Sequence, residues 1–292
     1  MRVLIVGPGY VGLELARQLC GLGNQVFGLR RSGDISGEMR AAGIKPLVGD
    51  ITEPASLAAL PSQYDWVVNC VSSTHGGAED YRRVYLEGAR NLVAWLAQTP
   101  PAKFVYTSST GVYGQNDGSL VDETSSTEPP TESSRVLVQT EGVFLDAVRK
   151  GSFPAVILRV AGIYGPGRSW YLRQFLAGEA RIEGEGRRTL NMIHRDDVAG
   201  SVIAALERGR PGGIYNAVDD EPVAQGELYK WLAGKLGAPM PPAIPEVADA
   251  LRRRGVTNKR ISNRKLRTEL GYAFHYPTYR EGYEREIAGL KS

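Results

Sequence analysis

The sequence predicts an α/β protein built on a doubly wound parallel sheet of about seven strands, with a small mixed region after it. Two observations predict this class. Short apolar runs alternate with stretches of helical periodicity over residues 1–165, and the first run ends in a glycine-rich turn that opens a helix. The alternation loosens over residues 166–292, although residues 190–217 contain a strand pattern that is expected to return to the sheet.

Size and composition exclude several functions. The chain has 292 residues and a net charge of +3, which is too small to favour nucleic acid or a membrane surface. No apolar run is long enough to cross a bilayer, and the first residues already form a strand, so no targeting segment is expected. Cys20 and Cys70 lack metal-ligand spacing. We expect a cytoplasmic protein without a metal site.

The first thirty residues predict a phosphate site. A strand at residues 2–6 leads into a glycine turn, a helix at residues 13–22 and a second strand at residues 25–29. In a Rossmann fold the three glycines permit the tight turn, the approach of a pyrophosphate and close helix packing. Residues that would bind a dinucleotide are Gly7, Gly9, Tyr10, Val11 and Gly12. The alternative is a purely structural glycine turn.

The end of the second strand indicates which dinucleotide binds. An acidic residue there would accept the ribose 2′-hydroxyl of NAD, but this chain has Arg30 and Arg31 and no acid before Asp34. Guanidinium groups pair well with a 2′-phosphate. The sequence therefore favours NADP(H) over NAD(H), with two solvent-facing arginines as the alternative.

Two further strand ends are expected at the same edge of the sheet, where ligands of open parallel sheets lie. After the strand at residues 44–48, Asp50 could accept from the adenine amino group or cap the next turn, and Ile51 follows it. At the end of the strand at residues 65–71, Cys70, Val71 and the following Ser72 are expected to bind the cofactor. His75 comes next and could act as a general acid or only form a hydrogen bond.

The remaining pattern continues the alternation. A strand at residues 103–107 runs into the segment 108–114, and the polar residues 115–130 are expected to form a surface loop that could close over a ligand. A strand is expected at residues 155–160 and another at 213–217. Helices are predicted at residues 54–60, 79–98, 133–150, 172–177, 198–207, 225–236, 265–270 and 279–290.

Six motifs in this order resemble the extended short-chain dehydrogenase/reductase superfamily, in its NAD(P)-dependent epimerase/dehydratase group. They are Gly7-x-Gly9-x-x-Gly12, Gly49-Asp50, the segment 108–114, Arg159-Val160-x-x-Ile163-Tyr164-Gly165-Pro166-Gly167, Ile193-His194-x-Asp196-Asp197-Val198 and Tyr215-Asn216. The resemblance implies a Rossmann domain over residues 1–165 and a substrate region over residues 166–292. It also implies a homodimer that pairs the helices 79–98 and 133–150 of each subunit.

The family's catalytic pattern is present only in part. The resemblance assigns the substrate-orienting hydroxyl to Ser109, but the Tyr-x-x-x-Lys of the next helix is missing. Anchoring on Glu141 places Ser133 and Leu137 at these two positions, and the shifted register places Arg135 and Gln139 there. The chain therefore resembles an atypical member that keeps the cofactor site and lacks the catalytic pair.

One hypothesis is an NADP(H)-dependent oxidoreductase or epimerase-like enzyme with a relocated proton donor. The proton could come from water or from Tyr113, Tyr164, His75 or His194. A small, anionic or nucleotide-sugar-like carbonyl or alcohol substrate could be bound by Arg168, Arg187, Arg188, His194, Lys259 and Arg260.

The other hypothesis is a non-catalytic NADP-binding sensor or scaffold. Loss of both the tyrosine and the lysine, with the glycine turn kept, is what this hypothesis predicts.

Overall fold

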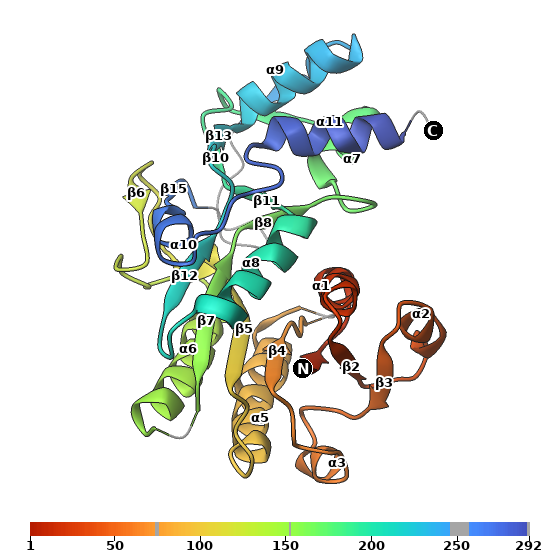
Figure 1. Cartoon of the computed structure of the whole chain (residues 1–292). Helices are drawn as coiled ribbons and strands as arrows, with labels where there is room; N and C mark the ends of the chain where they lie inside the picture. Colours follow the sequence, from red (N-terminus) through yellow and green to blue (C-terminus); the bar gives the residue numbers. More distant parts are fainter. Residues whose placement is uncertain (74–75, 152, 246–256, 291–292) are drawn as a thin grey trace.

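The structure is a computed structural model that describes residues 1–73, 76–151, 153–245 and 257–290. At its centre is a seven-stranded sheet with the strand order β12-β7-β5-β4-β1-β2-β3 (Figure 1). All neighbouring strands of this sheet run parallel. The predicted doubly wound α/β fold is therefore confirmed.

The sheet strands follow the predicted apolar runs. They are β1 (Arg2–Val6), β2 (Gln25–Arg30), β3 (Lys45–Val48), β4 (Trp66–Asn69), β5 (Lys103–Ser109), β7 (Ala155–Val160) and β12 (Ile214–Ala217). The chain starts in the middle of the sheet, moves outward to β3 and then returns to β4 on the other side of β1. This reversal opens a crevice beyond the carboxyl ends of β1 and β4.

Helices cover both faces of the sheet (Figure 1). One face carries α1 (Tyr10–Gly21), α2 (Ser36–Ala41) and α8 (Arg195–Arg208). The other carries α3 (Pro54–Ala58), α5 (Gly88–Leu96) and α6 (Glu132–Arg149). Because side chains alternate along a strand, Val3 and Ile5 of β1 pack toward α1 and α8, while Leu4 and Val6 pack toward the opposite helices.

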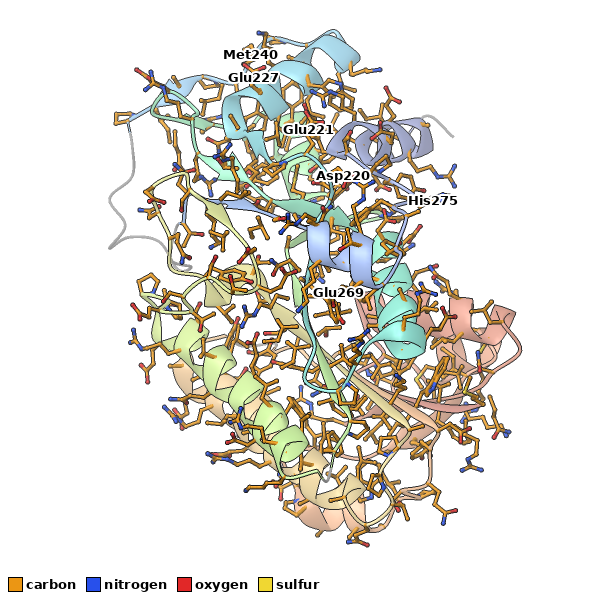
Figure 2. All side chains as sticks on the ribbon, turned by 60° about the vertical axis from the view of Figure 1, so that its left-hand side comes forward. Asp220, Glu221, Glu227, Met240, Glu269 and His275 are labelled. Atoms are coloured by element: carbon orange, nitrogen blue, oxygen red, sulfur yellow. The ribbon has the colours of Figure 1, made fainter. Side chains whose placement is uncertain are left out.

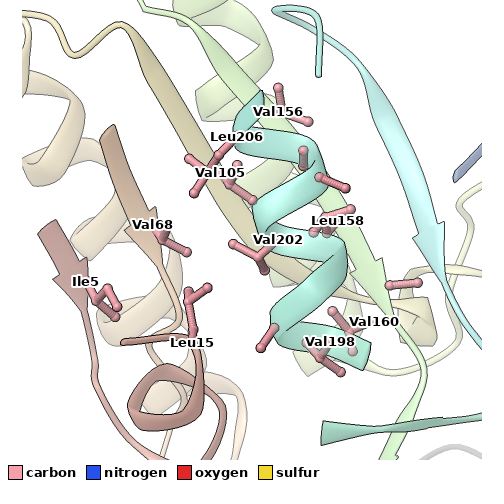
Figure 3. Close-up of a cluster of buried hydrophobic side chains, with 14 of the residues drawn as sticks. Ile5, Leu15, Val68, Val105, Val156, Leu158, Val160, Val198, Val202 and Leu206 are labelled. Atoms are coloured by element: carbon pink, nitrogen blue, oxygen red, sulfur yellow. The ribbon is translucent and has the colours of Figure 1, made fainter. Parts of the chain in front are cut away.

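The core between the sheet and α8 is made mainly of aliphatic side chains. Figure 3 shows Val198 of α8 beside Val160 of β7, and Leu206 of α8 beside Val105 of β5. All of these residues are buried. Burial of such side chains contributes about 1.5–3 kcal/mol each, so this layer fixes the strand ends on which the site is built.

The predicted helix 79–98 contains an irregular segment. It consists of α4 (Ala78–Tyr81), a π-helical stretch η1 (Arg82–Glu87) and α5. A π-bulge rotates the following residues relative to an ideal α-helix and often occurs at functional sites. Apolar periodicity alone does not reveal this change, because the helix continues on both sides of it.

The C-terminal region forms a separate core at the end of the molecule opposite α3 (Figure 1). It contains β8 (Gly162–Tyr164) paired with β11 (Met192–His194), and β10 (Thr189–Leu190) paired with β13 (Val223–Ala224). Its helices are α7 (Trp170–Leu176), α9 (Gln225–Leu236) and α11 (Tyr279–Gly289). Between these elements the chain returns to the main sheet through α8 and β12.

Short strand pairs connect distant parts of the sequence. Parallel pairs join β6 (Leu120–Val121) to β15 (Arg260–Ile261) and β9 (Ile182–Glu183) to β14 (Ala243–Ile244). Within the expected loop at residues 115–130, Gly118 N donates to Asn258 O at 2.8 Å, and Glu123 accepts from Asn216 N at 2.8 Å. This polar segment is therefore held against the C-terminal region, and of its residues only Pro130 lines the cavity described below.

Ion pairs attach the last helices to the turn before β13. Asp220 contacts Arg267 of α10 (Arg264–Glu269) at 3.1 Å, and Glu221 contacts Arg280 of α11. Figure 2 shows both carboxylates on the side of the molecule that carries α9, α10 and α11. Neither lines the cavity, so these pairs are structural.

Candidate functional site

A cavity of about 1170 Å³ lies along the carboxyl ends of β1, β2, β4 and β5 and continues into the C-terminal region. Single-ligand pockets usually measure roughly 300–1,000 Å³. This cavity can therefore hold a dinucleotide and a second small molecule. It brings together residues that lie far apart in the sequence, from the glycine turn to Lys259.

The glycine turn forms one end of the cavity. Gly7 N donates to Leu29 O at 3.0 Å, and α1 begins at Tyr10. A Cβ at Gly7 would lie 2.9 Å from the backbone of Val71, and a Cβ at Gly12 would lie 2.8 Å from Gly7 O. A Cβ at Gly9 would meet no atom closer than 3.9 Å. The first and third glycines are thus required by packing, whereas the space beside Gly9 is open.

All of the predicted cofactor-binding residues line this cavity. They are Gly7, Gly9, Tyr10, Val11, Gly12, Arg30, Arg31, Asp50, Ile51, Cys70, Val71 and Ser72.

At the end of β2 the two predicted arginines differ in their surroundings. Arg30 lies 3.9 Å from Asp34, while Arg31 is exposed. Asp50 Oδ1 accepts hydrogen bonds from the backbone and hydroxyl of Thr52 at 2.8 and 2.9 Å. Asp50 therefore caps the following turn and also lines the cavity, which keeps both of its predicted roles open.

At the end of β4, burial raises the pKa of the Cys70 thiol to about 12. A thiol with this pKa is a poor nucleophile at neutral pH, so Cys70 forms part of the wall. His75 lies outside the described residues.

The end of β5 carries Ser109, which lines the cavity and caps a short turn by accepting from Gly111 N at 3.0 Å. Because the oxygen accepts this bond, the hydroxyl hydrogen remains available to a ligand. The preceding Ser108 donates to Glu141 at 2.6 Å, and Glu141 pairs with Arg159 at 2.7 Å. This buried network fixes the end of β5.

Neither tyrosine proposed as a proton donor presents its hydroxyl to the cavity. Tyr113 is fully buried outside the lining and donates to Asn216 at 2.8 Å, while Arg159 donates to it at 2.9 Å. Tyr164 lines the cavity, but its hydroxyl lies 3.5 Å from the carbonyl oxygen of Thr278, the N-cap residue of α11. Burial raises the pKa of both phenols. These placements favour structural roles for both residues.

Helix α6 presents no titratable group to the cavity. Its lining residues are Ser134 and Leu137, while Gln139 lies on the outer surface. In the register anchored on Glu141, the position of the family's lysine is therefore occupied by Leu137, which lines the cavity. Two tyrosines of the neighbouring helical segment line the same cavity. Tyr81 directly precedes the π-helical stretch, and Tyr85 lies within it.

The predicted substrate residues separate into two groups. Arg168 and Lys259 line the cavity. Arg187 does not, because its side chain is 84% exposed and pairs with Glu185, and the neighbouring Arg188 takes the lining position. His194 is fully buried outside the lining, and its Nδ1 accepts from Asp196 N at 3.2 Å, which caps α8. Its surroundings favour a structural role.

Lys259 is a buried cation, with 3% of its surface exposed. Its Nζ donates to Tyr113 O at 2.8 Å and to Thr257 Oγ1 at 2.7 Å. Among the described residues no carboxylate lies within ion-pair distance of it, and burial lowers the pKa of Lys259 to about 8. It can therefore compensate an anion and can also lose a proton near neutral pH.

Sequence reasoning missed several residues at this end of the cavity: Trp170, Tyr171, Arg173, Thr189 and Asn191. Trp170 is 54% exposed although it is a large apolar side chain, and it begins α7 next to Tyr171. An aromatic pair between two arginines, Arg168 and Arg173, is a sequence signal that could have indicated them.

Cations dominate the lining. The basic residues that line the cavity are Arg30, Arg31, Arg168, Arg173, Arg188 and Lys259. Among the described residues that line it, Asp50 supplies the only carboxylate. No group of metal-ligating side chains was found among the described residues. In the same part of the chain, no helix combines the length and the apolarity needed to cross a membrane.

The fold and the site define a Rossmann protein whose cavity joins a glycine turn at the N-terminus of α1 to a second region lined by cations. A profile of the NAD dependent epimerase/dehydratase family matches residues 3–217. The chain belongs to this family, and its resemblance to the extended short-chain dehydrogenase/reductase superfamily is confirmed.

Three relatives illustrate this similarity. Protein YeeZ of Escherichia coli K12 is 32% identical over 282 residues, which cover 94% of this chain and 96% of that protein. A 3-diazoavenalumate denitrifying reductase from a Streptomyces species is 26% identical over 310 residues, which cover 98% and 100%. The solved structure of a conserved protein of unknown function from Silicibacter pomeroyi has a TM-score of 0.82 and 30% identity and covers 99% of this chain and 98% of that one.

Proposed function

We propose that this protein is an NADP(H)-dependent oxidoreductase or epimerase-like enzyme that acts on a small anionic carbonyl or alcohol substrate, with nucleotide sugars among the candidates. The observation that carries this proposal is the continuous cavity with a phosphate-binding turn at one end and buried and exposed cations at the other.

The residues present fit a dinucleotide. The space beside Gly9 is unfilled by protein, and the first N–H groups of α1 have no partner within the helix. Together they form a cradle for a pyrophosphate. When bound, NADP(H) would donate or accept a hydride.

The NADP preference rests on Arg30 and Arg31. Both line the cavity after β2, and no carboxylate at this strand end lines it to accept a ribose 2′-hydroxyl. The pair between Arg30 and Asp34 is long, at 3.9 Å, so a 2′-phosphate can compete for this guanidinium.

At the other end Arg173, Arg188 and Lys259 would bind the substrate anion, and Ser109 would donate a hydrogen bond to the reacting oxygen. Lys259 donates to the carbonyl of Tyr113, four residues beyond Ser109, so it belongs to the same wall. With a pKa of about 8 it can also exchange a proton. The name of the Streptomyces relative, a reductase, is consistent with hydride chemistry.

The second candidate is a non-catalytic NADP-binding sensor or scaffold. The specific observation in its favour is that α6 presents Leu137 at the position where the first register expects the family's lysine, and that no titratable side chain of α6 lines the cavity. This candidate shares the cofactor site and differs only in turnover.

The test is a titration of NADPH and NADH into the wild type and into the double variant Arg30→Ala/Arg31→Ala. The wild type should bind NADPH more tightly, and the variant should lose about 1–3 kcal/mol of NADPH binding with little change for NADH. Equal wild-type affinities would refute the NADP preference. Intact NADPH binding without turnover on a broad carbonyl and nucleotide-sugar panel would favour the second candidate.

A further inference from the structure

Tyr10, the first residue of α1, has its ring between two guanidinium groups. The guanidinium carbon of Arg168 lies 5.2 Å from the ring centroid, and that of Arg195 lies 5.3 Å from it. Both distances are within the range of cation–π contacts. Two positive charges therefore gather beside the residue that follows Gly9.

The two arginines differ in what else they contact. Arg195 is held by Glu14 at 3.4 Å and by Asp196 at 2.9 Å. Arg168 is exposed and lines the cavity, and among the described residues no carboxylate lies within ion-pair distance of its side chain. Arg168 is thus the member of this pair that a ligand can use.

The position of Tyr10 indicates which kind of ligand could reach Arg168. Tyr10 is at the N-terminus of α1, where unpaired N–H groups and the helix dipole favour phosphate. A guanidinium over its ring lies beside this phosphate site, and guanidinium binds phosphate oxygens with two hydrogen bonds. The sequence alone assigns Arg168 to the substrate, because the residue lies in the C-terminal region.

We propose that Arg168 is a cofactor-binding residue whose guanidinium contacts the dinucleotide pyrophosphate at the N-terminus of α1. This inference rests on the proposed function. Arg168 N donates to Gly165 O at 2.9 Å, and Ser169 Oγ donates to the same oxygen at 3.1 Å, so the segment that presents the arginine is anchored.

The test compares Arg168→Ala with the matched control Arg187→Ala, which removes an exposed guanidinium outside the cavity. NADPH, NADH and adenosine 2′-monophosphate, which lacks the pyrophosphate, are titrated into each protein. Arg168→Ala should weaken NADPH and NADH binding by the same factor, roughly ten- to a hundredfold. It should leave adenosine 2′-monophosphate binding unchanged, and the control should match the wild type with all three ligands.

Three results would overturn the inference. Unchanged NADPH affinity in Arg168→Ala, with wild-type binding intact, would overturn it alone and leave the proposed function standing. A loss confined to the anionic probe UDP, titrated in the same way, would return Arg168 to the substrate end. Failure of the wild type to bind either dinucleotide would refute the proposed function itself. Because Arg168 is exposed, thermal unfolding of the variant should match the wild type, which shows that any loss is local.

Discussion

Substitution of Lys259 by methionine removes a buried charge while keeping a side chain of similar length. Burial lowers the pKa of Lys259 from its usual 10.5 to about 8. At about 1.4 kcal/mol per pKa unit, holding the charged form in the folded protein costs roughly 3 kcal/mol. Its hydrogen bonds to Tyr113 O and Thr257 offset about 1 kcal/mol each. At pH 7.5 the variant should therefore be within about 2 kcal/mol of the wild type.

The pH dependence separates the charge from the packing. Between pH 8 and 10.5 the unfolded wild type binds more protons at this position than the folded protein does, so the free energy of unfolding rises with pH in this window. Below pH 8 both states are protonated and the full cost of burial remains. The methionine variant lacks this rise.

The assay is urea denaturation of both proteins at pH 7.5 and pH 10. The free energy of unfolding of the wild type minus that of Lys259→Met should be higher at pH 10 than at pH 7.5 by roughly 2–3 kcal/mol. Lys230→Met, which removes an exposed ammonium on α9, is the control and should show no such shift. A difference that stays constant between the two pH values would refute the account of Lys259.

Two further predictions concern helix α6. Glu141→Leu leaves Arg159 buried without its carboxylate and should lower the free energy of unfolding by about 3–5 kcal/mol. The double variant Glu141→Leu/Arg159→Met should recover much of this loss. A loss below about 1 kcal/mol in the single variant, measured by urea denaturation, would contradict the prediction. For the proposed homodimer, Gly142 of α6 is informative because a Cβ there meets no atom within 4 Å, and it lies in a surface groove with Arg82 and Asp146. Gly142→Trp should fold normally but run as a monomer in light scattering, and an unchanged dimer, or a wild type that is already monomeric, would refute this interface.

Much of the fold was predictable because its signals are local. The seven sheet strands are short apolar runs, and buried parallel strands need no other information. The glycine turn is equally local, since Gly7 and Gly12 are required by contacts within the first strand–helix unit and its neighbour. The cofactor end of the site was predicted for this reason.

The rest depends on contacts between distant segments. Tyr113 lies in a motif that suggested chemistry, but its environment is set by Arg159 and Asn216. Arg187 and Arg188 are indistinguishable in sequence, and only the path of the chain before β10 shows which one faces the cavity. The burial of Lys259 likewise depends on Thr257 and on the carbonyl of Tyr113, 146 residues away.

The central claim is that one cavity holds NADP(H) with its phosphates on the glycine turn and its reactive end beside Ser109. A crystal structure of the protein with NADP⁺ tests this most directly. The account predicts the 2′-phosphate at Arg30 and Arg31, the pyrophosphate between the N-terminus of α1 and Arg168, and the nicotinamide ring near Ser109 and Lys259. A 2′-phosphate remote from both arginines, or a nicotinamide ring outside the cavity, would contradict it.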